Sequence, residues 1–289
     1  MRYLINDHEN EVIERFDALL EAITRETDAL LSPEQMAALR SYDFPGNART
    51  RLATADWQRR LRGIARGEQF LIRHLLDHPG SHFAELGCGL GTWCFLAALA
   101  GAQEVTGIDL NRERLETASQ IARTLLPQFS SAQFHFLYQS LFRAQFHRPV
   151  DVFYLKAAIH HIRPLDQLFE YLRENLSPGG VVIVHDSNAW HPLIQWQAWR
   201  DRGFRKLASM PDPETGERID YAVEDFLSVP ELIRYFRRHG FEIAHAEAYV
   251  GLRARADDRL WESILKPLNQ TLPISSLFAM TYQIVARAK

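Results

Sequence analysis

Short apolar runs alternate with segments of helical periodicity over most of the chain. The apolar runs predict strands at residues 82–86, 104–109, 133–138, 150–155, 180–185, 241–249 and 277–287. Between them, apolar positions recur at helical spacing in segments that include 92–100, 112–125, 165–175 and 230–239. Strands that alternate with helices form βαβ units, so the pattern predicts a parallel sheet with helices on both faces.

The first 78 residues carry helical periodicity without strand-like runs. A helix is predicted over residues 9–31, and the sequence Ser-Pro-Glu-Gln from Ser32 is typical of another helix start. A further helix is predicted from about residue 55 to residue 76. We therefore expect a helical cap at 1–78 and an α/β domain at 79–289.

Arginines gather in the predicted cap, and an RNA-binding patch is one interpretation. Helical geometry favours another, because Arg59, Arg62 and Arg66 fall opposite the apolar stripe that includes Trp57 and Leu61. We interpret the cluster as a solvent-exposed helix face. Its members are Arg49, Arg51, Arg59, Arg60, Arg62 and Arg66.

Residues 187–228 interrupt the alternation after the fifth predicted strand. This segment is rich in aromatic residues and follows the carboxyl end of a strand, where open α/β sheets bind ligands. The aromatic side chains suit a cover over an apolar small-molecule substrate. They equally suit packing of the insertion onto the domain, and both roles can hold at once.

A glycine-rich turn follows the first predicted strand. Glu85 ends the apolar run, and Gly87, Gly89 and Gly91 follow at alternate positions. Glycine permits a sharp turn into a helix and lets a ligand approach the backbone closely. The second predicted strand ends at Asp109, whose carboxylate is suited to bind a ribose diol.

The glycine spacing distinguishes two cofactors. A dinucleotide fingerprint requires Gly-x-Gly-x-x-Gly, but the third position here is Thr92. Glu-x-Gly-x-Gly-x-Gly with a later strand-end Asp resembles the motifs of class I S-adenosylmethionine (SAM)-dependent methyltransferases. The resemblance implies a Rossmann-like, doubly wound seven-stranded sheet with an antiparallel last strand. It also fits an N-terminal helical cap and an insertion after strand five.

The same resemblance implies a set of SAM-binding residues. The family often places an Asp after strand three to hold the adenine, whereas this chain has Gln139 and Ser140 there. Lys156 lies where the methionine carboxylate of SAM is expected. The implied cofactor set is Glu85, Gly87, Cys88, Gly89, Gly91, Asp109, Leu110, Gln139, Ser140, Leu141 and Lys156.

Two histidines follow the fourth predicted strand, and Asp186 follows the fifth. This arrangement resembles small-molecule O-methyltransferases of the sugar-modifying kind, which implies that His160 removes the acceptor proton and that Asp186 assists it. A pair of histidines here also occurs in family members where neither is catalytic, and His161 can simply pack or cap a helix. Together with Trp190 and His191, His161 is a substrate-binding candidate.

Composition fits an enzyme of ordinary globular character. The 289 residues are 46% apolar and 24% charged, with a net charge of −3, which gives no electrostatic case for nucleic acid or an anionic membrane. The two cysteines, Cys88 and Cys94, indicate neither a disulfide framework nor a metal site. No signal peptide or membrane span is recognisable, so a cytoplasmic location is expected. The oligomeric state is not predicted.

The sequence therefore predicts methyl transfer from SAM to a small-molecule acceptor, with a hydroxyl as the favoured acceptor group. Methylation of an amine, a carboxylate, a carbon or an RNA base is the first alternative. A second alternative is a SAM-binding protein that transfers no methyl group to another molecule, either a sensor or a catalyst of an intramolecular reaction of SAM.

Overall fold

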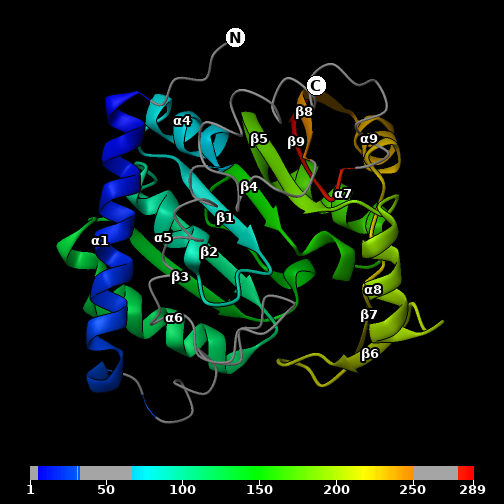
Figure 1. Cartoon of the computed structure of the whole chain (residues 1–289), viewed down its shortest axis with the longest axis horizontal. Helices are drawn as coiled ribbons and strands as arrows, with labels where there is room; N and C mark the ends of the chain where they lie inside the picture. Colours follow the sequence, from blue (N-terminus) through cyan, green and yellow to red (C-terminus); the bar gives the residue numbers. More distant parts are fainter. Residues whose placement is uncertain (1–5, 31, 33–66, 250–278) are drawn as a thin grey trace. The chain divides into compact units, whose positions relative to one another are not determined.

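The computed structural model describes residues 6–30, 32, 67–249 and 279–289. The arginine cluster, the predicted helix start after Ser32 and most of the predicted helix at 55–76 lie outside the described residues. The chain divides into two compact units, residues 1–138 and 139–289. Figure 1 shows the helices and strands of both units.

The strands form a seven-stranded sheet in the order β3-β2-β1-β4-β5-β9-β8. Strand β9 runs antiparallel to both of its neighbours, whereas the β1–β2, β2–β3 and β4–β5 pairs are parallel. The predicted sheet with its antiparallel last strand is therefore confirmed. The strand bounds are β1 His82–Leu86, β2 Glu104–Asp109, β3 Gln133–Tyr138, β4 Val150–Lys156, β5 Leu176–Ser187, β8 Phe241–Tyr249 and β9 Thr281–Ala288.

Helices cover the strands of the first unit. The long helix α1 packs against α4 and α5, and it buries an apolar face that includes Phe16 and Leu19 (Figure 1). Arg73 of α4 binds the buried carboxylate of Glu9, with Nη2 2.7 Å from Oε1. The helix bounds are α1 Asp7–Leu30, α4 Gln69–Asp77, α5 Thr92–Leu99, α6 Arg112–Thr124 and the 3-10 turn η1 Leu126–Gln128.

The second unit packs helices α7 and α9 around aromatic side chains. The ring of Phe169 lies 4.9 Å from that of Phe236, and Phe236 lies 5.5 Å from Phe241. Edge-to-face pairs of this kind contribute about 0.5–1.5 kcal/mol beyond the area that they bury. The bounds are α7 Leu165–Asn175, α9 Val229–Arg238, η2 Leu141–Arg143 and η3 Ile159–His161.

The insertion after β5 forms a helix and a hairpin. Helix α8 spans Pro192–Arg202, and strands β6 (Leu207–Pro211) and β7 (Arg218–Ala222) pair antiparallel. Ser228 then caps α9, because its backbone N–H and its hydroxyl both donate to the carboxylate of Glu231. The insertion therefore ends at Ser228, where the capping contacts fix the start of α9.

Candidate active site

The glycine turn lies between β1 and α5 in the first unit. Gly87, Gly89 and Gly91 have φ angles of 77°, 53° and 71°, in the left-handed region that residues with a Cβ rarely adopt. Gly91 is the residue immediately before α5. The alternation of glycines in the sequence thus corresponds to three backbone positions that require glycine.

Asp109 is tied to this turn by its carboxylate. Oδ2 accepts a hydrogen bond of 2.7 Å from the backbone N–H of Gly89, and Oδ1 accepts one of 2.8 Å from Asn111. Each carboxylate oxygen has a second acceptor position, so Asp109 retains the capacity to accept from the two hydroxyls of a ribose. Asp109 is half-buried, which leaves part of it accessible.

Side chains pack closely against the backbone beside the turn. A Cβ added to Gly107 would lie 2.8 Å from Sγ of Cys88 and from the ring of Phe136, and one added to Gly91 would lie 3.0 Å from the same ring. The ring of Phe136 therefore packs against the turn, in contact with Gly91 and Gly107, where only glycine fits. No motif in the sequence singles out this contribution of Phe136.

The side chains of Glu85 and Cys88 face the interior rather than solvent. Cys94 donates its thiol proton to Oε2 of Glu85 at 3.2 Å, and both residues are buried. Burial raises the pKa of the Cys88 thiol to about 11. Since the Cys88 thiol packs against Gly107, Cys88 can contribute to ligand binding through its backbone only.

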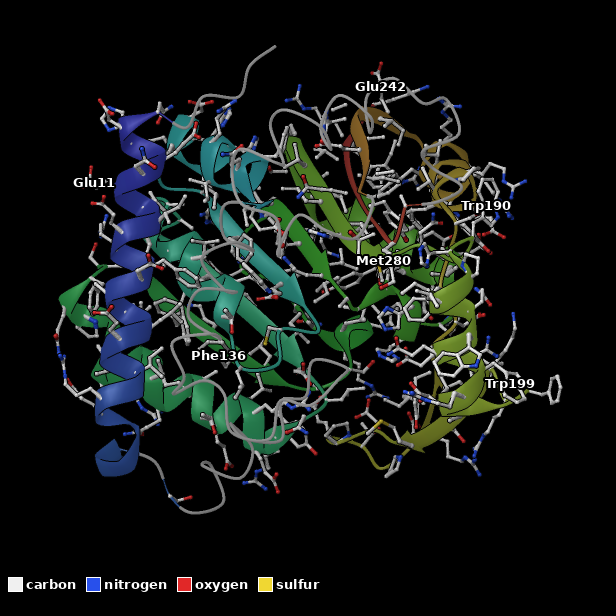
Figure 2. All side chains as sticks on the ribbon, viewed as in Figure 1. Glu11, Phe136, Trp190, Trp199, Glu242 and Met280 are labelled. Carbon is white, nitrogen blue, oxygen red and sulfur yellow. The ribbon has the colours of Figure 1, made fainter. Side chains whose placement is uncertain are left out.

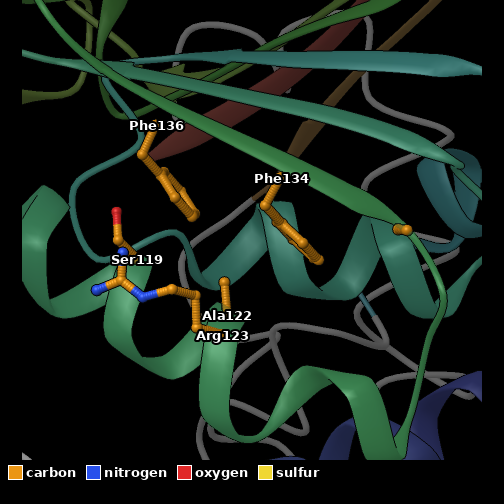
Figure 3. Close-up of a pocket in the computed structure, with 6 residues that line it drawn as sticks. Ser119, Ala122, Arg123, Phe134 and Phe136 are labelled. Atoms are coloured by element: carbon orange, nitrogen blue, oxygen red, sulfur yellow. The ribbon is translucent and has the colours of Figure 1, made fainter.

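A pocket of about 280 Å³ opens between β3 and α6 of the first unit. Figure 3 shows Phe134 and Phe136 projecting from β3 into the space beside α6, which contributes Ser119 and Arg123 to the lining. Phe136 thus contacts both the pocket and the glycine turn. The pocket contains none of the residues that the sequence predicts for the site.

The remaining cofactor candidates occupy strand ends and turns. Leu110 is half-buried and follows Asp109 in the first unit. In the second unit, Ser140 is buried directly before η2, and Lys156 is the half-buried last residue of β4. Gln139 and Leu141, which flank Ser140, are half-buried.

His160 and Asp186 lie together in the second unit, as the sequence predicts. Nδ1 of His160 lies 2.8 Å from each carboxylate oxygen of Asp186. A carboxylate only accepts hydrogen bonds, so Nδ1 carries the proton and donates it to Asp186. Both side chains are buried, and the backbone N–H of Ser187 donates a further 2.6 Å hydrogen bond to Asp186.

The surroundings of His160 raise its pKa. Burial alone would lower the pKa of the imidazole, but the negative charge of Asp186 and its hydrogen bond outweigh burial. Burial and the neighbouring His160 instead lower the pKa of His161. The two adjacent histidines therefore differ in proton affinity, and His160 is the stronger base.

The insertion contacts both histidines. The ring of Phe226 lies 4.4 Å from that of His160, and the backbone N–H of Asp225 donates to the carbonyl of His160. Nδ1 of His161 donates to the carbonyl of Ala222 at 3.1 Å. The sequence indicates only that the insertion is rich in aromatic residues. Of those that the structure describes, Phe226 is the one whose ring lies against His160.

Charged residues that the sequence did not single out complete this region. Glu224 has a φ of 47°, an uncommon value for a residue with a Cβ, and Oε1 lies 3.6 Å from Nε2 of His161. Arg163 pairs with the carboxylate of Asp225 at 2.5 Å, and Lys206 pairs with it at 3.0 Å. No local sequence pattern links these residues to His160, because the contacts arise only when the insertion folds back.

Trp190 and His191 lie just before α8, and no described contact joins either side chain to His160. Trp190 is exposed and His191 is half-buried. Figure 2 shows Trp190 and Trp199 at the outside of the chain, and Phe204 is 92% exposed. These aromatic side chains of the insertion therefore do not form its buried packing surface.

A methyltransferase-domain family model matches residues 77–225. Since the match covers more than half of the chain, the chain belongs to this family, the class I SAM-dependent methyltransferases. No curated protein matches it. It is an enzyme of the methyltransferase class, and SAM is the cofactor of this family.

Solved structures of methyltransferases share the fold. A SAM-dependent methyltransferase from Methanosarcina mazei is 20% identical over 75% of this chain and 96% of its own, with a TM-score of 0.53. Magnesium protoporphyrin IX methyltransferase from Synechocystis, solved with bound S-adenosylhomocysteine, is 16% identical over 89% and 95%, with a TM-score of 0.53. A SAM-dependent methyltransferase from Mesorhizobium loti is 19% identical over 76% and 96%, with a TM-score of 0.50.

The helices that the structure describes include none with the length and apolar character needed to cross a membrane.

Proposed function

We propose that this enzyme transfers the methyl group of SAM to a hydroxyl of a small molecule, with His160 as the base and Asp186 as its partner. One observation carries the proposal: both oxygens of a buried carboxylate lie 2.8 Å from Nδ1 of His160. This contact fixes the tautomer, so the lone pair of the ring is at Nε2. Within the described part of the chain, no hydrogen bond occupies Nε2 of His160.

The pair has the properties that deprotonation requires. A hydroxyl is a weak nucleophile until its proton is removed, and a positioned histidine typically accelerates such a step about 10²–10⁴-fold. Nε2 of His160 accepts the proton, and the carboxylate of Asp186 stabilises the imidazolium that results. Phe226 covers one face of the ring and limits the access of water to it.

The first unit supplies residues suited to the cofactor. SAM, when bound, provides a methyl group on a sulfonium that is already a good leaving group. Asp109 would accept hydrogen bonds from the ribose of SAM. The backbone of the turn at Gly87, Gly89 and Gly91 would lie against the bound ligand. In the second unit, Lys156 stays the predicted contact of the methionine carboxylate, and Gln139, Ser140 and Leu141 stay the predicted contacts of the adenine.

A small-molecule acceptor agrees with the chemistry of the insertion. Aromatic side chains with few polar groups suit an apolar ligand, and His161, Trp190 and His191 are the residues that we assign to it. The net charge of −3 gives no electrostatic support for RNA. The Synechocystis relative is named for a small-molecule substrate, magnesium protoporphyrin IX.

The test is a screen for methyl acceptors with isotopically labelled SAM. Purified protein is incubated with pooled metabolites and, separately, with RNA, and labelled products are identified by mass spectrometry. We expect a methyl ether that carries the label from SAM, formed from an alcohol or a phenol. Label that is found only on amines, carboxylates, carbon atoms or RNA would contradict it, as would SAM turnover that needs no acceptor.

A further inference from the structure

Three potential metal ligands gather beside the proposed base. One ring nitrogen each from His160 and His161 and one carboxylate oxygen of Glu224 lie within 4.8 Å of one another. Nε2 of His161 and Oε1 of Glu224 are 3.6 Å apart. Around a tetrahedral zinc ion with ligand distances of about 2.0–2.2 Å, neighbouring ligand atoms are about 3.4 Å apart. The His161–Glu224 pair is therefore close to a coordinating separation.

Both histidines have the tautomer that a metal ligand of this kind needs. Nδ1 of His160 donates to Asp186, and Nδ1 of His161 donates to the carbonyl of Ala222. Neither acceptor can donate a proton, so each neutral ring has its lone pair at Nε2. Histidines that bind zinc commonly donate their other ring N–H to a carboxylate or a backbone carbonyl, which orients the ring and raises its basicity.

The side chains of His161 and Glu224 form no hydrogen bond with each other. Their 3.6 Å separation exceeds the range for such a bond. In the neutral tautomer of His161, the ring presents a lone pair near a negatively charged oxygen. A cation between the two atoms turns this unfavourable arrangement into a favourable one.

We propose that His160, His161 and Glu224 bind a divalent transition-metal ion of the zinc type, with Asp186 and Ala222 orienting the two imidazoles. Two imidazoles and one carboxylate favour zinc or cobalt over magnesium or calcium, which prefer oxygen ligands. Three protein ligands leave a fourth position open. The sequence pattern did not predict a metal, because Glu224 lies in the insertion, far from the two histidines along the chain.

This site has a consequence that rests on the proposed function. The lone pair of His160 cannot bind a metal ion and accept a proton at the same time. Metal occupancy therefore inhibits methyl transfer if His160 is the base. SAM binding is unaffected, because the residues that we assign to the ribose and to the glycine turn are not ligands of the ion.

The test uses untagged full-length protein, since a histidine tag would itself bind the ion. The protein is freed of metal with a chelator and is then titrated with zinc chloride in a calorimeter. The visible spectrum of added cobalt(II) reports the coordination geometry. We expect one ion per chain and a tetrahedral cobalt spectrum for the wild type, with at least a tenfold loss of zinc affinity in Glu224→Gln and His161→Ala.

Glu214→Gln is the matched control, because it makes the same chemical change at an exposed position of the insertion and should bind zinc like the wild type. SAM affinity, measured on every variant, reports that the fold is intact. Absence of stoichiometric zinc binding by the wild type would overturn the site, and so would equal zinc affinity in Glu224→Gln and Glu214→Gln.

The same samples separate the two proposals. Zinc that binds through Glu224 and abolishes methyl transfer supports the metal site and the base together. Zinc that binds through Glu224 without any inhibition supports the metal site and contradicts the role of His160 as the base. Failure to bind zinc overturns the metal site alone, because the hydrogen bond between His160 and Asp186 does not depend on it.

Discussion

The glycine turn of the first unit and the histidine pair of the second present different kinds of groups. At the turn, the decisive groups are backbone atoms at Gly87, Gly89 and Gly91, and the carboxylate of Asp109 binds the N–H of Gly89. At the pair, they are side chains, and the surrounding contacts come from η3, from the end of β5 and from the insertion.

This difference explains why the glycine turn leaves a complete motif in the sequence, whereas the contacts of Glu224 and Phe226 around the histidines do not. A site made of backbone restricts residue type at neighbouring positions, so it leaves a short motif. A site made of side chains depends on tertiary contacts between distant segments. In the proposed function the two regions have separate tasks, cofactor binding at the turn and proton acceptance at the pair.

The largest effect is expected from His160→Ala. Loss of a general base should lower kcat by about 10²–10⁴-fold, while the affinity for SAM stays near that of the wild type. Steady-state kinetics with the acceptor found in the screen, together with calorimetry of SAM binding, measure both quantities. His147→Ala, at an exposed position of the same unit, is the control. Unchanged kcat in His160→Ala across neutral pH would remove the base assignment.

A smaller effect is expected from Asp109→Ala, and it concerns SAM affinity instead of kcat. Hydrogen bonds to a charged group are worth about 1.5–3 kcal/mol, so SAM affinity should fall about 10–100-fold, with kcat at saturating SAM retained. Calorimetric titration with SAM and with S-adenosylhomocysteine measures the loss. Asp77→Ala, on the exposed end of α4, serves as the reference. Equal affinities of the two variants would exclude Asp109 as a ribose ligand.

Gly107→Ala tests the support beneath the glycine turn. The added Cβ would lie 2.8 Å from Cys88 and Phe136, and overpacking of this kind costs about 1–3 kcal/mol. Thermal unfolding should shift downward by about 2–4 °C for each kcal/mol lost. Gly67→Ala is matched, because its added Cβ meets no atom within 4 Å apart from those of neighbouring backbone. If both variants melt at the same temperature, Phe136 does not pack closely against β2.

Ser228→Ala should have the smallest effect. It removes the hydroxyl that caps α9 where the insertion ends, and loss of such a cap costs about 1 kcal/mol. Chemical denaturation of this variant and of Ser131→Ala, an exposed serine, measures the difference. An unfolding free energy that is equal in both would show that the cap contributes nothing to stability.

Much of the fold could be predicted because the apolar runs coincide with buried strands. The predicted bounds of β1 and β2 agree with the structure, since each strand is almost wholly buried and ends at a polar site residue or a turn. Strand β5 begins earlier than predicted, at Leu176, because Leu176 pairs with Val150 across an irregularity in the ladder. The β6–β7 hairpin lacks apolar alternation and was not predicted.

The candidate site was predicted in part for the same physical reason. His160 follows β4 and Asp186 lies at the carboxyl end of β5, so their meeting follows from the parallel pairing of β4 with β5. Glu224 and Phe226 belong to a segment without a motif, and only the folding of the insertion brings them to the histidines. Which aromatic residue contacts His160 could not be predicted from composition.

The separation of tasks is tested most directly by the double variant Asp109→Ala/His160→Ala, measured for SAM affinity and for kcat at saturating SAM. We expect the double variant to have the SAM affinity of Asp109→Ala and the kcat of His160→Ala, each within about twofold, as for independent sites. A double variant whose SAM affinity lies well below that of Asp109→Ala, or whose kcat exceeds that of His160→Ala, would contradict it.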